Sequence, residues 1–223
     1  MKKNLSLVMV IIFVITCFSG CTNNKQFDTS AVIEAAKKYE LTKAQSLEDA
    51  LQYANVLSDE LKTDGAYYVA NAKNAAQNAY DSWNEDSKLP KVNVDEFVFG
   101  AVVESELSQK QTEIFGEDVD GYYMNTPSYF VLLVLNNTDD AQKIFEKFKT
   151  ENGTAKNGEH NGYKYLISSE ISGEDDFDEK HVFKTGIYMQ GNRILIVSAS
   201  GLDDGKTGFA YYIFKELGLI DPK

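Results

Sequence analysis

The chain has 223 residues, with 34 acidic and 22 basic side chains, and its formal net charge is −12 at neutral pH. This length suits one large domain or two small ones. A surface of this sign repels the phosphates of nucleic acids and anionic lipid headgroups, so we expect no nucleic-acid partner.

The first twenty residues have the layout of a secretory leader. Two lysines precede an apolar run of about 14 residues, Leu5–Phe18. This run is short of the roughly 20 residues that a membrane-spanning helix needs. Small residues, Ser19 and Gly20, then precede Cys21. We therefore predict that residues 1–20 are a signal peptide that is removed on export.

The residues Phe18-Ser19-Gly20-Cys21 resemble a bacterial lipobox, in which small residues before the cysteine let the peptidase reach the bond. The resemblance implies cleavage between Gly20 and Cys21 and a diacylglycerol thioether on Cys21. Two acyl chains give stable anchoring where one chain is marginal. The alternatives are a plain secretory leader that is cut elsewhere and an uncleaved membrane anchor. Cys17 follows Thr16, which fits the pattern poorly, so Cys17 is expected to leave with the leader.

Cleavage removes two lysines and no acid, so the remaining 203 residues carry a charge of −14. Cys21 is then the one cysteine left in the sequence, which excludes a disulfide and a thiol nucleophile. The lipid, and not the charge, must hold the protein at the outer face of the cell membrane. Because 21 of the 22 basic residues are lysines, as AT-rich coding produces, we expect a Gram-positive host.

Two segments are predicted between the leader and residue 90. Residues 21–28 are polar and without periodicity, which is typical of a tether. Residues 29–90 carry apolar side chains at spacings of three and four, which predicts a helical region. The pair Ser46 and Asp49, or the pair Thr42 and Gln45, is predicted to cap its second helix.

The segment 66–70 suits either a strand or the first turns of a helix from Gly65 to Trp83, and we favour the helix. A possible internal repeat argues for the strand. The stretches VANAKNAAQNAYDSW and VLNNTDDAQKIFEKF align at an offset of 65 residues. A true repeat consists of two strand–helix units and makes 66–70 a strand. Since any two amphipathic helices align about this well, both readings stay open.

Beyond Pro90 the apolar pattern changes from a helical period to a period of two. Gly191 and Asn192 suit a two-residue hairpin turn. Thr138 is predicted to cap a helix, and Gly218 to end the last one. The segments 153–162 and 172–180 are expected to be loops. The predicted strands are 92–107, 128–135, 163–171, 182–190 and 193–200.

This order of elements predicts an α+β fold. We expect N-terminal helices followed by a mostly antiparallel sheet with helices packed on one face. The α+β domain of residues 91–223 is expected to be continuous with the helical region of residues 29–90.

Three stretches carry a resemblance to known proteins: Ile114-Phe115-Gly116, the helix DDAQKIFEKF, and the strand pair YMQGNRILIVSAS. In this order they resemble a pattern in small clostridial surface lipoproteins of unknown function. The resemblance covers residues 114–217, about half the chain. The resemblance implies an extracytoplasmic α+β module and indicates no active-site residues. The first third of the chain, which is predicted to be helical, does not share it.

No motif predicts catalysis, a metal or a cofactor. The two histidines, His160 and His181, are expected in exposed loops and lack a third ligand at zinc spacing. The acidic run 174–179 offers carboxylates without EF-hand spacing, so calcium binding there stays open. Gly201–Gly208 follows a strand as a phosphate loop does, but its two aspartates repel phosphate.

Tyrosines supply the one candidate binding surface. Tyr122, Tyr123 and Tyr129 lie among small polar residues in a predicted loop. Tyrosine combines contact area with a hydroxyl group, which suits the recognition of peptides or sugars. The alternative is that these tyrosines rim the core of the sheet and extend their hydroxyls to water.

The sequence therefore predicts a membrane-anchored, non-enzymatic binding or interaction module. Its partner, besides the membrane, is expected to be a protein, a cell-wall polymer or a small ligand. The alternative is an extracytoplasmic hydrolase that uses an acidic pair brought together by the fold. A cleft with two facing carboxylates favours the hydrolase, whereas a tyrosine-lined surface favours the binding module.

Overall fold

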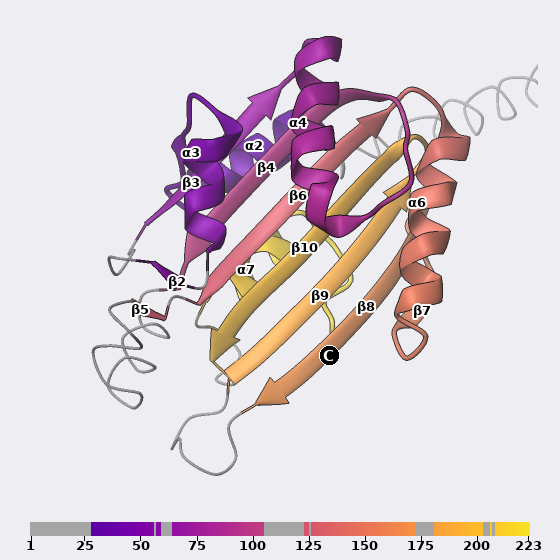
Figure 1. The fold of residues 1–223 in the computed structure, drawn as a ribbon. Helices are drawn as coiled ribbons and strands as arrows, with labels where there is room; N and C mark the ends of the chain where they lie inside the picture. The colour runs from indigo at the N-terminus through magenta and orange to yellow at the C-terminus, as the bar shows by residue number, and fades with distance from the viewer. Residues whose placement is uncertain are drawn as a thin grey trace, which may run out of the picture.

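The computed structural model describes residues 28–55, 57–58, 64–104, 123–124, 126–172, 181–202, 206 and 208–223. These residues form an α+β fold around one eight-stranded sheet (Figure 1). The predicted fold class is confirmed at this level. In spatial order the sheet consists of β1 (Thr42–Lys43), β3 (Gly65–Ala70), β4 (Val94–Val103), β6 (Pro127–Leu135), β10 (Arg193–Leu202), β9 (His181–Gln190), β8 (Tyr163–Ser172) and β7 (Lys156–His160).

Neighbouring strands of the sheet are antiparallel, except that β1 runs parallel to β3. A separate two-stranded ladder joins β2 (Leu57–Ser58) to β5 (Tyr123–Met124). The helices are α2 (Thr29–Lys38), α3 (Leu47–Leu51), η1 (Gln52–Ala54), α4 (Lys73–Ser87), α6 (Thr138–Glu151) and α7 (Phe209–Glu216).

Helices cover both faces of the sheet, which corrects the expectation of helices on one face. We call the face under α3, α4 and α6 the front face, and the face under α2 and α7 the back face (Figure 1). The central strands explain the arrangement, because successive residues such as Phe97 and Val98, or Phe130 and Val131, are all fully buried. A strand that is apolar on both sides needs a cover on both sides.

The segment 66–70 is a strand, so the favoured helix from Gly65 to Trp83 is wrong. Strand β3 pairs with β1 and β4, and α4 begins only at Lys73. Alanine favours a helix in isolation, but here the pairing with β4 decides the conformation. A Cβ atom on Gly65 would lie 2.6 Å from the carbonyl oxygen of Ala101, so this close approach of two strands requires a glycine.

Two of the predicted helix ends are confirmed and one is wrong. Ser46 and Asp49 form a capping box at the start of α3. Gly218, with φ of +61°, follows directly after α7 and its C-cap residue. Helix α6, however, is capped one residue earlier than predicted. The Asn137 side chain, and not that of Thr138, accepts from the backbone N–H of Asp140 at 2.8 Å.

Two hairpins close one side of the sheet. The predicted turn at Gly191 and Asn192 is confirmed, since Gln190 pairs with Arg193 across it. The segment 153–162 is not only a loop, because it contains β7, which joins β8 through Asn161 and Gly162 with φ of +46° and +81°. Asn-Gly is a strong hairpin signal. The strand KNGEH carries no apolar residue, so no period-two pattern marks it.

The C-terminal tail lies against the back face and is held by three side chains. The Tyr163 hydroxyl accepts from the N–H of Ile220 at 2.9 Å, and the Tyr188 hydroxyl donates to its carbonyl oxygen at 2.6 Å. Lys184 pairs with Asp221 at 2.6 Å. Burial raises the pKa of both tyrosine hydroxyls above the ordinary value, which keeps them neutral donors and acceptors.

Candidate functional site

The structure separates the residues that the sequence singled out. Gly20, Cys21, Tyr122 and the acidic run 174–179 lie outside the described residues. Tyr123 lies in β5, and nothing is described of its side chain. Tyr129 falls in both the predicted loop and the predicted strand 128–135, and the strand is confirmed, because Tyr129 belongs to β6. Its half-buried ring stacks on Phe99, with ring centroids 6.4 Å apart.

The two histidines also occupy strands and not loops. His160 is exposed in β7, at the edge of the sheet. His181 is 5% exposed at the start of β9, so the expectation of an exposed loop histidine is wrong there. Among the described residues, no three His, Cys, Asp or Glu side chains are placed to hold a metal ion.

The helices cover only part of the front face. One register row across β6, β10, β9 and β8 contains aliphatic residues that are all buried, and α6 packs over β6, β10 and β9. These residues are Val131, Ile196, Ile187 and Leu166. The next row on the same face contains a hydroxyl group in every strand. We call this row, Tyr129, Ser198, Thr185 and Ser168, the hydroxyl row.

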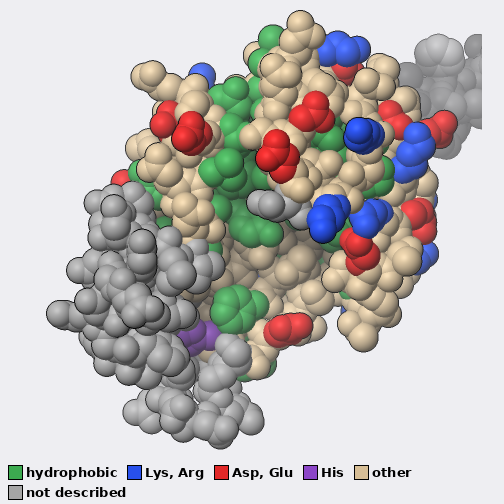
Figure 2. Space-filling model, viewed as in Figure 1, with side chains coloured by type: hydrophobic (Ala, Val, Ile, Leu, Met, Phe, Trp, Pro, Cys, Tyr) green, Lys and Arg blue, Asp and Glu red, His purple; other side chains and the backbone are tan. Residues whose placement is uncertain are grey.

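The hydroxyl row is accessible to solvent. Ser168 is exposed, and the other three residues are half-buried. Since neighbouring strands lie about 4.8 Å apart, the row is about 14 Å long. Figure 2 shows the same face, with a largely tan, uncharged area below the helices. The row thus presents four aligned hydroxyl groups next to the edge of the helical layer.

An aromatic side chain extends this surface by one further row. Phe183 is 39% exposed and lies between Ser200 and Glu170 on the neighbouring strands. Ser200 is buried, so we call the hydroxyl row together with Phe183 and Glu170 the open patch. It combines hydroxyl groups and two aromatic rings with a single charged side chain.

The back face of the same strands does not change in this way. Val197, Ala199 and Ile167 are buried there in the cluster that α7 covers. The next back-face row is also polar, with Ser128, Lys184 and Ser169, but Ser128 and Lys184 are buried and Ser169 is half-buried. What distinguishes the front face is a row of accessible hydroxyl groups across all four strands.

A buried carboxylate lies at the same end of the sheet, towards the back face. Glu104 is 8% exposed, and its Oε1 atom accepts from the Ser128 hydroxyl at 3.0 Å and from the Phe209 N–H at 2.9 Å. The Ser128 hydroxyl in turn accepts from the Ser200 N–H at 2.8 Å. Because these bonds end on the backbone of α7 and β10, the cluster has a structural role.

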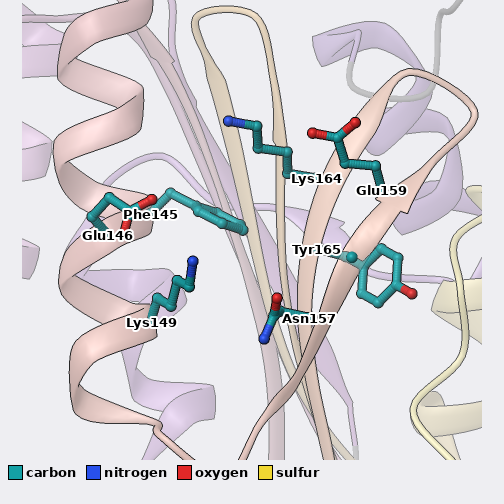
Figure 3. A pocket seen from close by; sticks show the side chains of 8 residues that line it. Phe145, Glu146, Lys149, Asn157, Glu159, Lys164 and Tyr165 are labelled. Atoms are coloured by element: carbon teal, nitrogen blue, oxygen red, sulfur yellow. The ribbon is translucent and has the colours of Figure 1, made fainter.

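A small pocket of about 230 Å³ lies between α6 and the hairpin β7–β8 (Figure 3). The side chains of Phe145, Lys149 and Lys164 extend into the gap, whereas the ring of Tyr165 points away from it. Lys164 also donates to the Gln142 side chain at 3.0 Å. The residues that line the pocket are Phe145, Glu146, Lys149, Asn157, Gly158, Glu159, Lys164 and Tyr165.

Comparison with known proteins adds no assignment: no family model, no curated protein and no solved structure matches this chain. Within the described residues, no helix is long and apolar enough to cross a membrane.

Proposed function

We propose that this protein is a lipid-anchored, extracytoplasmic binding module that holds the uncharged glycan strands of a cell-wall polymer on its open patch. The leader and the lipobox support the location. One observation supports the binding surface: on the front face alone, four neighbouring strands change from buried aliphatic to accessible hydroxyl side chains at the same register row.

The chemistry of the open patch favours a polyhydroxylated ligand. Hydroxyl groups both donate and accept hydrogen bonds, so a row of them matches the hydroxyl and amide groups of a glycan chain. Tyr129 and Phe183 add aromatic surface for its apolar ring faces. Glu170 is the one charged member of the patch. Its carboxylate repels an anionic polymer, and a single carboxylate offers only one ion pair to a cationic polymer.

The hydrolase alternative has less support. Glu146 and Glu159 both line the pocket beside α6, which is the kind of pairing that such an enzyme needs. Both residues are exposed, however, and two lysines share the pocket with them. A general acid is usually held in apolar surroundings that keep its proton in place.

A binding assay with purified cell walls tests the proposal. The full chain carrying Cys21→Ser is incubated with peptidoglycan from a Gram-positive bacterium, after removal of proteins and anionic polymers, and the bound fraction is measured by sedimentation. Thr185→Lys places a long, charged side chain in the middle of the hydroxyl row. We expect it to weaken binding about tenfold, the equivalent of roughly 1.4 kcal/mol.

Thr138→Lys is the matched control, because it makes the same change at an exposed residue of α6, which follows the end of β6 that is remote from Tyr129. It should bind as the parent does, and all proteins should show the same thermal unfolding. Binding that Thr185→Lys leaves unchanged would remove the open patch from the proposal. Absence of binding by the parent chain would remove the glycan ligand.

A further inference from the structure

Two strand–helix units of the chain correspond at a constant offset of 65 residues. Strand β3 ends at Ala70 and β6 at Leu135, and α4 begins at Lys73 and α6 at Thr138. Ala76 and its counterpart Ala141 are both fully buried. The sequence left the internal repeat open. In the structure the two units correspond from the ends of β3 and β6 into α4 and α6.

A glutamine at the same position joins its helix to a later strand in both units. The Gln77 amide donates to Asp81 at 3.0 Å, and the Gln142 amide donates to Glu146 at 2.7 Å. Each glutamine oxygen also accepts from a strand beyond its helix. Gln77 accepts from the Val94 N–H of β4, and Gln142 accepts from the Lys164 ammonium of β8, both at 3.0 Å. In both units the glutamine therefore lies between the helix and the chain that borders the space beside it.

In the first unit this space is filled by the chain itself. The Tyr80 hydroxyl donates to the Pro90 carbonyl oxygen at 2.7 Å. The Asn84 side chain donates to the Leu89 carbonyl oxygen at 3.1 Å and accepts from the Leu89 N–H at 2.7 Å. Leu89 is 6% exposed, so α4 holds a short, irregular peptide segment through its backbone groups.

In the second unit the corresponding space is the pocket of about 230 Å³. The counterparts of Tyr80, Asp81 and Asn84 are Phe145, Glu146 and Lys149, and all three line this pocket. The chain after α6 does not fill it, because it turns at residues 153–154 into β7, which forms the opposite wall.

We propose that this pocket binds a small zwitterionic, peptide-like ligand, either an amino acid or a dipeptide. Lys149 replaces the amide of Asn84, and with Lys164 it offers ammonium groups to a free carboxylate. Glu146 and Glu159 offer carboxylates to a free ammonium group, and Phe145 supplies apolar surface. The volume is below the roughly 300 Å³ of pockets for drug-sized ligands, which limits the ligand to one or two residues.

Titration of the full chain carrying Cys21→Ser, followed through backbone amide chemical shifts, tests this inference. The probes are leucine, leucyl-proline, and leucyl-proline blocked at both ends so that it carries no charge. Leucyl-proline copies the segment Leu89–Pro90 of the first unit. We expect leucine or leucyl-proline to change the chemical shifts of the Gly158 and Lys164 amides. The blocked peptide should bind at least about fivefold more weakly, because it cannot form charge-assisted hydrogen bonds.

Lys149→Gln should weaken binding of the zwitterion about fivefold. Lys147→Gln is the matched control, because Lys147 lies on the same helix and pairs with Glu151 without lining the pocket. Equal binding of the blocked and free peptides would overturn the inference, as would no shift at the pocket with any probe. An equal loss of binding in Lys149→Gln and Lys147→Gln would also overturn the inference. The test does not depend on the cell-wall proposal.

Discussion

Asp140 concentrates several interactions at the start of α6. Its buried carboxylate accepts from Lys143 at 2.7 Å and from the Asn137 amide at 3.1 Å. The hydrogen bond from Lys143, together with its charge and the bond from Asn137, holds the pKa of this carboxyl below its ordinary value. The ionised form is therefore the one that stabilises the folded chain.

The sign of the resulting pH dependence follows from that lowered pKa. Since the folded value lies below the unfolded value of about 4, the stabilisation is present above about pH 4 and is lost as the pH falls through the folded value. We expect Asp140→Asn to lower the free energy of unfolding at pH 7 by about 1.5–3 kcal/mol. Below about pH 4, the stability of the Asp140→Asn variant should depend less on pH than that of the parent protein, as measured by urea unfolding.

Asp139→Asn is the control for this experiment. Asp139 is an exposed acid in the same first turn of α6, so it shares the interaction with the helix dipole but not the buried contacts. If both variants lost the same stability and the same pH dependence, the dipole and not the Asp140 contacts would be responsible.

At the scale of elements, α7 depends on a residue from a distant part of the chain. Its N-cap residue is Gly208, which has no side chain to accept from the first turn. Glu104, which follows β4, accepts from the Phe209 N–H in its place. A carboxylate at this end also interacts favourably with the helix dipole.

Removal of this cap should loosen α7 specifically. We expect Glu104→Ala to cost about 3 kcal/mol, because it leaves buried donors without an acceptor, and Glu104→Gln to cost less. Amide hydrogen exchange should accelerate in α7 and remain unchanged in α6. Unchanged exchange in α7 of the Glu104→Ala protein would contradict the capping role.

At the scale of the whole molecule, attachment to the membrane is expected to depend on Cys21 alone. Without the predicted signal peptide the chain would carry a charge of −14, and a surface of this sign does not attract anionic lipids. We expect Cys21→Ser to release the protein from the membrane fraction, and Cys17→Ser to leave it attached. The readout is fractionation with a carbonate wash, and Cys21→Ser protein that stays with the membranes would rule out the lipid anchor.

Features that depend on residues close together in the chain were predictable. The capping box of Ser46 and Asp49 and the hairpin at Gly191 and Asn192 each involve a few consecutive positions. The strands of the sheet's centre were recognisable from their apolar runs. The leader and its cysteine are also read from a short, continuous stretch, and their processing remains a prediction.

Tertiary structure decided the features that join distant positions. Segment 66–70 is a strand because β4 lies beside it, and its alanines alone favoured a helix. The open patch was not predictable, because Tyr129 meets Ser198 only through strand pairing, and each strand contributes one unremarkable hydroxyl group. The pocket beside α6 likewise needs the register of β7 and β8. A local pattern specifies a cap or a turn through neighbouring residues, whereas a site depends on which strands pair and in which register.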